Sequence, residues 1–257
     1  MDMRKSRVLG KLRSGKLASC TKLNLADARA AEIAAMSGFD CVWLGMEHVP
    51  NTLHDIENQI RAIKMCNVDA LVRVPRGSYS DLILPLEMDA AGIMVPHVMS
   101  ASDAREIAWR TRFHPIGRRP IDGGNADGAY CLIPPEQYTR EANEQRFVII
   151  QIEDPEPLDE LDEIAQVEGI DMLFFGPGDF SHAIGAVGRA DPRADEARRR
   201  VAQAAVRHGK FAGTVGTPQN LAELVEMGYR FVNLGADVLA LTGYFQSMAS
   251  AFKTPSD

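Results

Sequence analysis

Two carboxylate side chains follow short apolar segments. Residues 147–152 run directly into Glu153, and residues 172–175 run through a Gly-Pro-Gly turn into Asp179. Apolar segments of this length, bounded by turn residues, are typical of buried parallel strands. Parallel sheets and barrels gather their functional groups at the carboxyl ends of the strands, so we expect both acids at one edge or mouth. Two carboxylates that meet there can hold a divalent metal ion.

Other predicted strands end in polar residues that would share this mouth. His48 follows the apolar segment 40–44, Arg73 lies in the segment 70–74, and Gln151 stands two residues before Glu153. An arginine in a buried strand without a function is uncommon. A histidine titrates near neutral pH and is suited to proton transfer. In a barrel these residues would lie around one mouth, although they are far apart in the sequence.

Each of these residues also has an ordinary structural interpretation. Glu153 could be a solvated loop residue, and Asp179 could cap a helical turn that begins at Phe180. Arg73 could pair with Asp69 or Asp81. The other interpretations that stay open concern His48 as a loop histidine, Glu87 as a solvated helix residue, and His97 as a structural residue rather than one that lines the pocket.

The elements that position these residues alternate between strand and helix. The predicted strands are 17–21, 40–44, 70–74, 92–95, 147–152, 172–175, 211–215 and 231–234. The predicted helices are 25–36, 53–65, 79–88, 101–112, 158–166, 192–208, 220–227 and 238–252. Such alternation predicts parallel pairing, and eight repeats in 257 residues predict a closed (β/α)₈ TIM barrel that occupies residues 1–257 as a single domain. The long connection 114–146 is expected to be functional or mobile.

Composition narrows the classes of partner. The formal net charge is −7, so no basic excess is present to neutralise the phosphates of nucleic acid or of an anionic membrane. No apolar segment approaches membrane-spanning length, and the charged first residues are followed by no secretory signal. The four cysteines form no CxxC pair. A reduced, cytoplasmic protein is therefore expected.

Several motifs occur in an order that resembles a known family. They are Gly38-Phe39-Asp40, Glu47-His48-Val49-Pro50-Asn51, Val72-Arg73, Gly92-Ile93-Met94-Val95-Pro96, Gln151-Ile152-Glu153, Val167-Glu168-Gly169-Ile170-Asp171 and Gly176-Pro177-Gly178-Asp179-Phe180-Ser181. Over nearly its whole length the chain is similar to the metal-dependent (class II) pyruvate aldolases of the 4-hydroxy-2-oxoheptanedioate and 2-dehydro-3-deoxyglucarate aldolase type. Citrate lyase β-subunits are more distant relatives.

The resemblance implies a role for each matched residue. Glu153 and Asp179 would hold the metal, for which Mg²⁺ or Mn²⁺ is expected and Co²⁺ is a further option. Arg73 would face the keto oxygen of bound pyruvate, and Gln151 would support the site. The backbone around Gly178 and Asp179 would bind the substrate carboxylate. The remaining implied pair is His48 as acid/base, with Glu87 on the following helix as its acidic partner.

The expected reaction is the reversible aldol cleavage of a 4-hydroxy-2-oxo acid into pyruvate, or a similar 2-oxo acid, and an aldehyde. The chain departs from the family at Gly45, where an acid is usual, and in the loop after Arg119, so the preferred aldehyde stays open. Three alternatives remain: decarboxylation of a 2-oxo acid such as oxaloacetate, a Schiff-base aldolase that uses Lys22, and a non-catalytic barrel that binds a 2-oxo acid or metal.

The last predicted helix, residues 238–252, has apolar side chains around much of its circumference. An exposed stripe of this width usually meets a partner. The family exchanges this helix between subunits of hexamers, so the resemblance implies a homo-oligomer, with a hexamer favoured.

Overall fold

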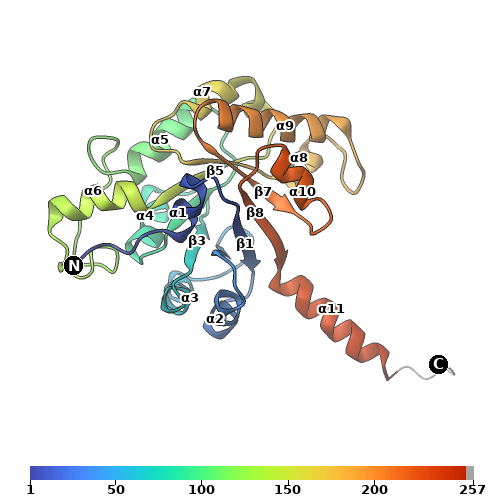
Figure 1. Cartoon of the computed structure of the whole chain (residues 1–257), viewed down its shortest axis with the longest axis horizontal. Helices are drawn as coiled ribbons and strands as arrows, with labels where there is room; N and C mark the ends of the chain where they lie inside the picture. Colours follow the sequence, from blue (N-terminus) through green and yellow to red (C-terminus); the bar gives the residue numbers. More distant parts are fainter. Residues whose placement is uncertain (253–257) are drawn as a thin grey trace.

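A computed structural model describes residues 1–252. Eight parallel strands form a closed barrel in which each strand pairs with the next along the chain and the last pairs with the first (Figure 1). The strands are β1 (Ala18–Leu23), β2 (Cys41–Gly45), β3 (Asp69–Arg73), β4 (Gly92–Val95), β5 (Phe147–Ile152), β6 (Met172–Phe175), β7 (Phe211–Gly216) and β8 (Phe231–Ala236). The predicted (β/α)₈ barrel is confirmed.

Most of the helices surround the barrel on its outside. The helices are α1 (Arg7–Arg13), α2 (Ala28–Met36), α3 (Leu53–Met65), α4 (Tyr79–Glu87), α5 (Ala101–Thr111), α6 (Pro135–Gln145), α7 (Leu161–Ala165), α8 (Pro177–Ala183), α9 (Pro192–Arg207), α10 (Leu221–Glu226) and α11 (Asp237–Ser250), with a 3₁₀ turn, η1 (Glu156–Glu160), before α7. The predicted helix 158–166 is wrong in its first part, because the chain forms this tighter turn between Pro155 and α7. No helix in the described range is long and apolar enough to cross a membrane.

The interior of the barrel is filled by side chains from alternate strand positions. Trp43 packs edge-on against Phe174, and Phe174 packs edge-on against Phe231. A second, larger core fills the space between the strands and the outer helices. The interior packing closes the barrel below its carboxyl end, so polar side chains at the strand ends face a cavity with a solid floor.

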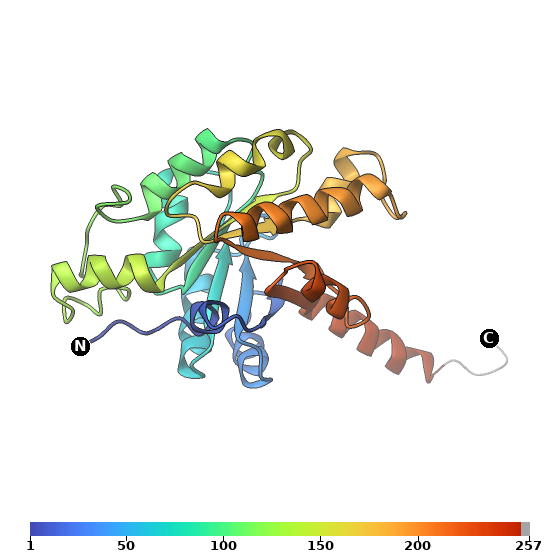
Figure 2. The ribbon, with the colours of Figure 1, turned by 45° about the horizontal axis from the view of Figure 1, so that its top comes forward.

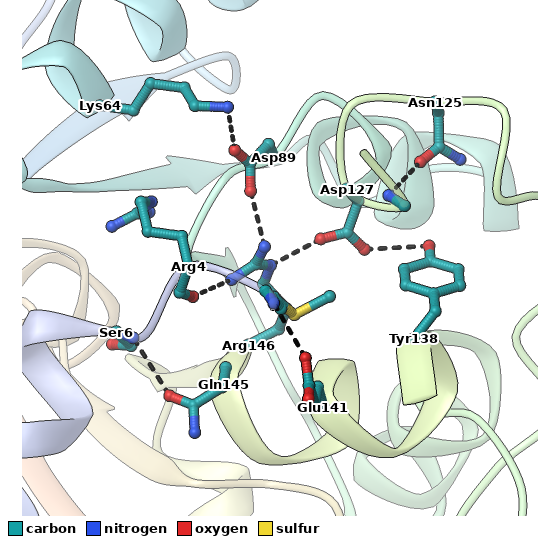
Figure 3. Close-up of polar contacts among 12 residues, drawn as sticks. Arg4, Ser6, Lys64, Asp89, Asn125, Asp127, Tyr138, Glu141, Gln145 and Arg146 are labelled. Atoms are coloured by element: carbon teal, nitrogen blue, oxygen red, sulfur yellow. Dashed lines mark hydrogen bonds and ion pairs between the residues drawn. The ribbon is translucent and has the colours of Figure 1, made fainter. Parts of the chain in front are cut away.

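The opposite end of the barrel is held together by buried ion pairs (Figure 3). Arg146, which immediately precedes β5, bonds Asp89 at 2.6 Å and Asp127 at 2.7 Å. Asp127 belongs to the long connection after α5 and also accepts a hydrogen bond from Tyr138 of α6 at 3.0 Å. The long connection is therefore fastened to the barrel by its own acidic residue, and it includes a helix that the sequence did not predict.

The last helix leaves the body of the molecule. Figures 1 and 2 show α11 extending away from the barrel, and none of its residues is buried. Its apolar side chains face solvent, with exposed fractions of 69% for Leu239 and 61% for Phe245. A single copy of the chain thus leaves a large apolar surface uncovered.

Candidate active site

A cavity of about 750 Å³ opens at the carboxyl ends of the strands. The predicted site residues that line it are His48, Arg73, Gln151, Glu153, Gly178 and Asp179. These residues come from the ends of β2, β3, β5 and β6, as the position of polar residues after apolar segments indicated. The cavity has the size of an ordinary small-molecule site.

Glu153 is a buried carboxylate that β5 delivers to the cavity. It is 1% exposed, and it accepts hydrogen bonds from the His97 backbone N–H at 3.0 Å and from Gln151 Nε2 at 2.7 Å. Burial raises the pKa of Glu153 to about 7; the bond from His97 opposes this shift, while the charges of Asp179 and Glu47 add to it. The interpretation of Glu153 as a solvated loop residue is wrong.

Asp179 lines the same cavity from the first turn of α8. That helix begins at Pro177 with Gly176 as its N-cap and has no side-chain cap. Asp179 therefore does not cap a turn that begins at Phe180, and its exposed carboxylate is free to serve another partner. The N–H groups of Gly178 and Asp179 stand in the first turn, where a helix provides no internal acceptor.

Gly176 leaves room for the Glu153 carboxylate. A Cβ atom at this position would lie 2.4 Å from Glu153 Oε2 and 2.7 Å from Glu153 Cβ, so any side chain would displace the carboxylate. At Gly45, in contrast, a Cβ would meet only Val49 and the Leu23 carbonyl, at ordinary contact distances of 3.6 and 3.8 Å. The glycine that replaces the family's usual acid is therefore not required by packing.

Arg73 is directed into the cavity by β3 and pairs with a residue to which the sequence analysis gave no role. Its Nε lies 2.9 Å from Glu47 Oε2, in an ion pair that lacks the alignment of a hydrogen bond. The alternative partners are occupied elsewhere: Asp69 pairs with Arg4, and Asp81 accepts bonds from Ser78 at the start of α4. Pairing of Arg73 with Asp69 or Asp81 is therefore wrong.

His97 could be either a structural histidine or a residue of the site, and its contacts bear on this choice. Its Nδ1 is 2.8 Å from Asp154 Oδ2, and its Nε2 is 3.7 Å from Glu47 Oε1. Burial alone would lower the pKa of His97, but Asp154, Glu153 and Glu47 together raise it. Its backbone is left-handed, with φ of 49°, a conformation that non-glycine residues adopt rarely and often at functional sites.

His48 lies on the loop after β2 and is half exposed. Its Nε2 is 3.4 Å from Glu47 Oε2. Asn51 holds this loop against the barrel, because its side-chain amide donates to the Gly45 carbonyl at 3.0 Å. His48 and His97 therefore approach the two oxygens of the same carboxylate, Glu47.

Glu87 is not brought to this group. It does not line the cavity, and it is the last residue of α4, which runs from the mouth back toward the opposite end of the barrel. Burial raises the pKa of Glu87, with Arg119 opposing the shift and Asp122 and Asp127 adding to it. The predicted contact between Glu87 and His48 is absent within one described chain, and an acid–base role for Glu87 stays a prediction.

The donor set suits a hard divalent cation. Ligand atoms of Glu47, His97 and Glu153 lie within 4.8 Å of one another; among the described residues Asp179 is not part of this close group, although it lines the same cavity as Glu153. Gln151 Oε1 and Asn233 Oδ1, both buried at this cavity, have no hydrogen-bond partner among residues 1–252. The charges of Asp179 and Glu47 both add to the raised pKa of Glu153, and a bound cation would stabilise carboxylates that act on one another in this way.

Over most of its length the chain is similar to known aldolases. The chain is 34% identical to the 2-keto-3-deoxy-L-rhamnonate aldolase of Klebsiella pneumoniae over 88% of this chain and 85% of that one. It is 34% identical to the hydroxypyruvate/pyruvate aldolase of Pseudomonas aeruginosa over 98% and 95%. An HpcH/HpaI aldolase structure from Desulfitobacterium hafniense superposes with a TM-score of 0.88 at 28% identity, covering 96% of this chain and 97% of that one. The family description "HpcH/HpaI aldolase/citrate lyase" matches residues 22–242, and the chain belongs to this family.

Proposed function

We propose that this protein is a divalent-metal-dependent aldolase that cleaves 4-hydroxy-2-oxo acids into pyruvate, or a similar 2-oxo acid, and an aldehyde. One observation carries the proposal: the buried Glu153 carboxylate shares a cavity with Asp179 and Arg73. The names of the relatives, which are aldolases of 2-keto-3-deoxy-L-rhamnonate and of hydroxypyruvate and pyruvate, support a 2-oxo acid as the common substrate class.

Glu153 and Asp179 would hold the cation, and Mg²⁺ or Mn²⁺ fits their oxygen ligands. When bound, such a cation supplies Lewis acidity to the oxygens of a 2-oxo acid. The chain itself supplies donors: Gln151 Nε2 bonds the Glu153 carboxylate at 2.7 Å. Gly178 and Asp179 line the cavity, and their backbone N–H groups would bind the substrate carboxylate.

Arg73 would stabilise the negative charge that develops on the keto oxygen when the carbon–carbon bond breaks. A positioned charged donor of this kind contributes roughly 3 kcal/mol to the transition state. Glu47 holds the guanidinium in place through the 2.9 Å ion pair. His48, which lines the cavity and lies beside Glu47, would exchange a proton with the hydroxyl of the substrate.

The test is pyruvate release from 4-hydroxy-2-oxo acids. We expect EDTA to abolish activity, Mn²⁺ or Mg²⁺ to restore it, and Glu153→Gln to prevent the restoration by removing a charged ligand of similar shape. Glu156→Ala, which removes an exposed acid three residues away, is the matched control. Activity of Glu153→Gln that persists in EDTA would contradict the proposal. Measuring CO₂ beside the aldehyde separates cleavage from decarboxylation.

We also propose that the chain works as a homo-oligomer, with a hexamer favoured. The support is α11, whose apolar side chains are exposed in one copy. Leu239 of this helix lines the cavity while 69% of it remains exposed, so a subunit covering α11 would also complete the cavity wall.

A further inference from the structure

Lys22 is a lysine inside the barrel to which the proposed mechanism gives no role. It continues the inward-facing positions of β1 after Ala18 and Cys20, and it lies in register with Trp43 of β2. Its Nζ is 5.2 Å from the centre of the Trp43 ring, and Arg73 Cζ is 5.0 Å from the same centre. Lys22 also lines the cavity that contains Glu153 and Asp179.

The ammonium group of Lys22 has no anionic partner in the part of the chain that the structure describes. Of the acids that face it, Glu47 is engaged with Arg73, and Asp237 accepts bonds from the backbone N–H groups of residues 24 and 25. Asp179, the third acid, is a proposed metal ligand. Burial and the nearby Arg73 lower the pKa of Lys22, against the raising effect of these acids. A partly buried cation beside another cation is stabilised when an anion binds between or beside them.

The strand order of the barrel places Lys22 on the wall opposite Glu153. β1 and β5 are four strands apart in a ring of eight, so Lys22 and Glu153 occupy opposite walls of the mouth. A 2-oxo acid bound at Glu153 and Asp179 would extend away from these residues into the cavity. The end of the substrate that is remote from the 2-oxo group would then approach the wall that carries Lys22.

We propose that Lys22 binds an anionic group, a carboxylate or a phosphate, at the remote end of the aldehyde acceptor, and so selects acidic aldehydes over neutral ones. This deepens the proposed function and rests on it. The cavity of about 750 Å³ has room for an acceptor of several carbons beside a 2-oxo acid.

The test uses the full-length enzyme with Mn²⁺ and two matched pairs of acceptors. One pair is succinic semialdehyde and its methyl ester; the other is glyceraldehyde 3-phosphate and glyceraldehyde. For each pair, the ratio of kcat/KM for the anionic over the neutral acceptor in pyruvate addition is measured in wild type, Lys22→Met, Lys22→Arg and the control Lys16→Met. Lys16 is exposed and lies outside the cavity, so its variant controls for net charge.

We expect the wild type to favour the anionic member of at least one pair, and Lys22→Met to lower that ratio by about tenfold to hundredfold, mainly through KM. Lys22→Arg should restore much of the ratio, and Lys16→Met should not change it. The pair that responds identifies carboxylate or phosphate. An unchanged ratio in Lys22→Met, an equal loss for both members of each pair, or borohydride trapping of pyruvate on Lys22 would overturn the assignment.

The two proposals fail in different ways. Exchange of the methyl protons of pyruvate with D₂O, followed by NMR, needs no acceptor. A wild-type enzyme without Mn²⁺-dependent exchange would contradict the proposed function, whereas exchange combined with an unchanged acceptor ratio would contradict the role of Lys22 alone.

Discussion

The position of the Glu153 carboxylate depends on the absence of a side chain at residue 176. Glu153 follows β5, and Gly176 follows β6, so the two residues come together only because these strands are neighbours in the barrel. The Gly176 N–H donates to the Ile152 carbonyl at 3.1 Å, which fixes the backbone beside the carboxylate. The glycine of the Gly-Pro-Gly turn therefore has a steric function in the site as well as a turn function.

At the scale of the single residue, Gly176→Ala tests this arrangement. The new methyl group would lie 2.4 Å from Glu153 Oε2, so the carboxylate must move by about 1 Å. We expect weaker Mn²⁺ binding and a fall in kcat/KM of about hundredfold, because displacements of this size have such effects on positioned groups. Titration with Mn²⁺ by calorimetry and retro-aldol kinetics measure both quantities.

Gly10→Ala in α1 is the matched control, since a Cβ there meets nothing within 4 Å. The backbone at Gly176 has φ of −96°, which alanine adopts readily, so the variant is expected to fold. Wild-type affinity for Mn²⁺ in Gly176→Ala would show that the carboxylate does not have to remain where the structure places it.

Much of the site could be predicted because it lies at strand ends. Glu153, Asp179, Arg73 and Gln151 all follow or terminate apolar segments, and their positions share one cavity. Glu47 received no role, because no local pattern shows that its carboxylate would meet Arg73 and two histidines. Glu87 was paired with His48 from family resemblance alone, and the direction of α4 separates the two within one chain.

The long connection after α5 is fixed by a buried carboxylate as well as by a small apolar cluster that includes Ile133, Tyr138 and Ala142. Asp127, at 2% exposure, receives bonds from Arg146, Arg119 and Tyr138. Burial would raise the pKa of Asp127, but Arg146 and Arg119 lower it below its ordinary value. A carboxylate held in this way fastens the connection to the barrel as long as it stays ionised.

Asp127→Asn is expected to lower the free energy of unfolding by about 3–5 kcal/mol, because it leaves two buried arginines with one fewer counter-charge. The folded-state pKa is below the unfolded one, so the stabilisation is present above pH of about 4 and is lost as pH falls through the lower, folded-state value. Denaturant unfolding at pH 7 and at several acidic pH values measures both effects, and the difference between wild type and variant should shrink in acid.

Asp122→Asn is the matched control in the same connection. Asp122 is exposed and only accepts a local bond from the Gly124 N–H, which an asparagine oxygen can also accept. A similar loss in both variants, or a pH-independent difference between wild type and Asp127→Asn, would contradict the stabilising role of the buried carboxylate.

At the level of elements, the strands could be predicted almost completely, because runs such as 147–152 and 172–175 are apolar on both faces. The helices α1 and α6 were not predicted, and α8 was considered only as a helical turn that begins at Phe180. α6 begins at Pro135 and buries only Tyr138 and Ala142, so it has too few apolar residues to be recognised as a helix from the sequence. α8 begins with a Pro-Gly pair that is typical of a turn, and tertiary packing of Phe180 against Phe175 outweighs that tendency.

At the scale of the whole molecule, the last helix, α11, packs against little of its own chain and has no buried residue. Tyr244 and Phe245 pack edge-on against each other on α11 and are 59% and 61% exposed. Paired aromatic residues at this exposure are typical of surfaces that become buried on association. The apolar core between the strands and the other helices includes no residue of α11, so we expect the barrel to stay folded when this helix is altered.

We therefore expect the wild-type chain to sediment as a homo-oligomer at micromolar concentration, and Tyr244→Glu/Phe245→Glu to shift it toward monomer. The substitutions place two charges on a surface that association would remove from water, which is costly without partners. Gln246→Glu on the same helix adds a charge without removing an apolar side chain and should leave the mass unchanged. Analytical ultracentrifugation measures the mass, and circular dichroism should show an intact fold in all three proteins. A wild-type chain that sediments as a monomer would refute the assembly, and loss of fold in the double variant would show that α11 contributes to the barrel itself.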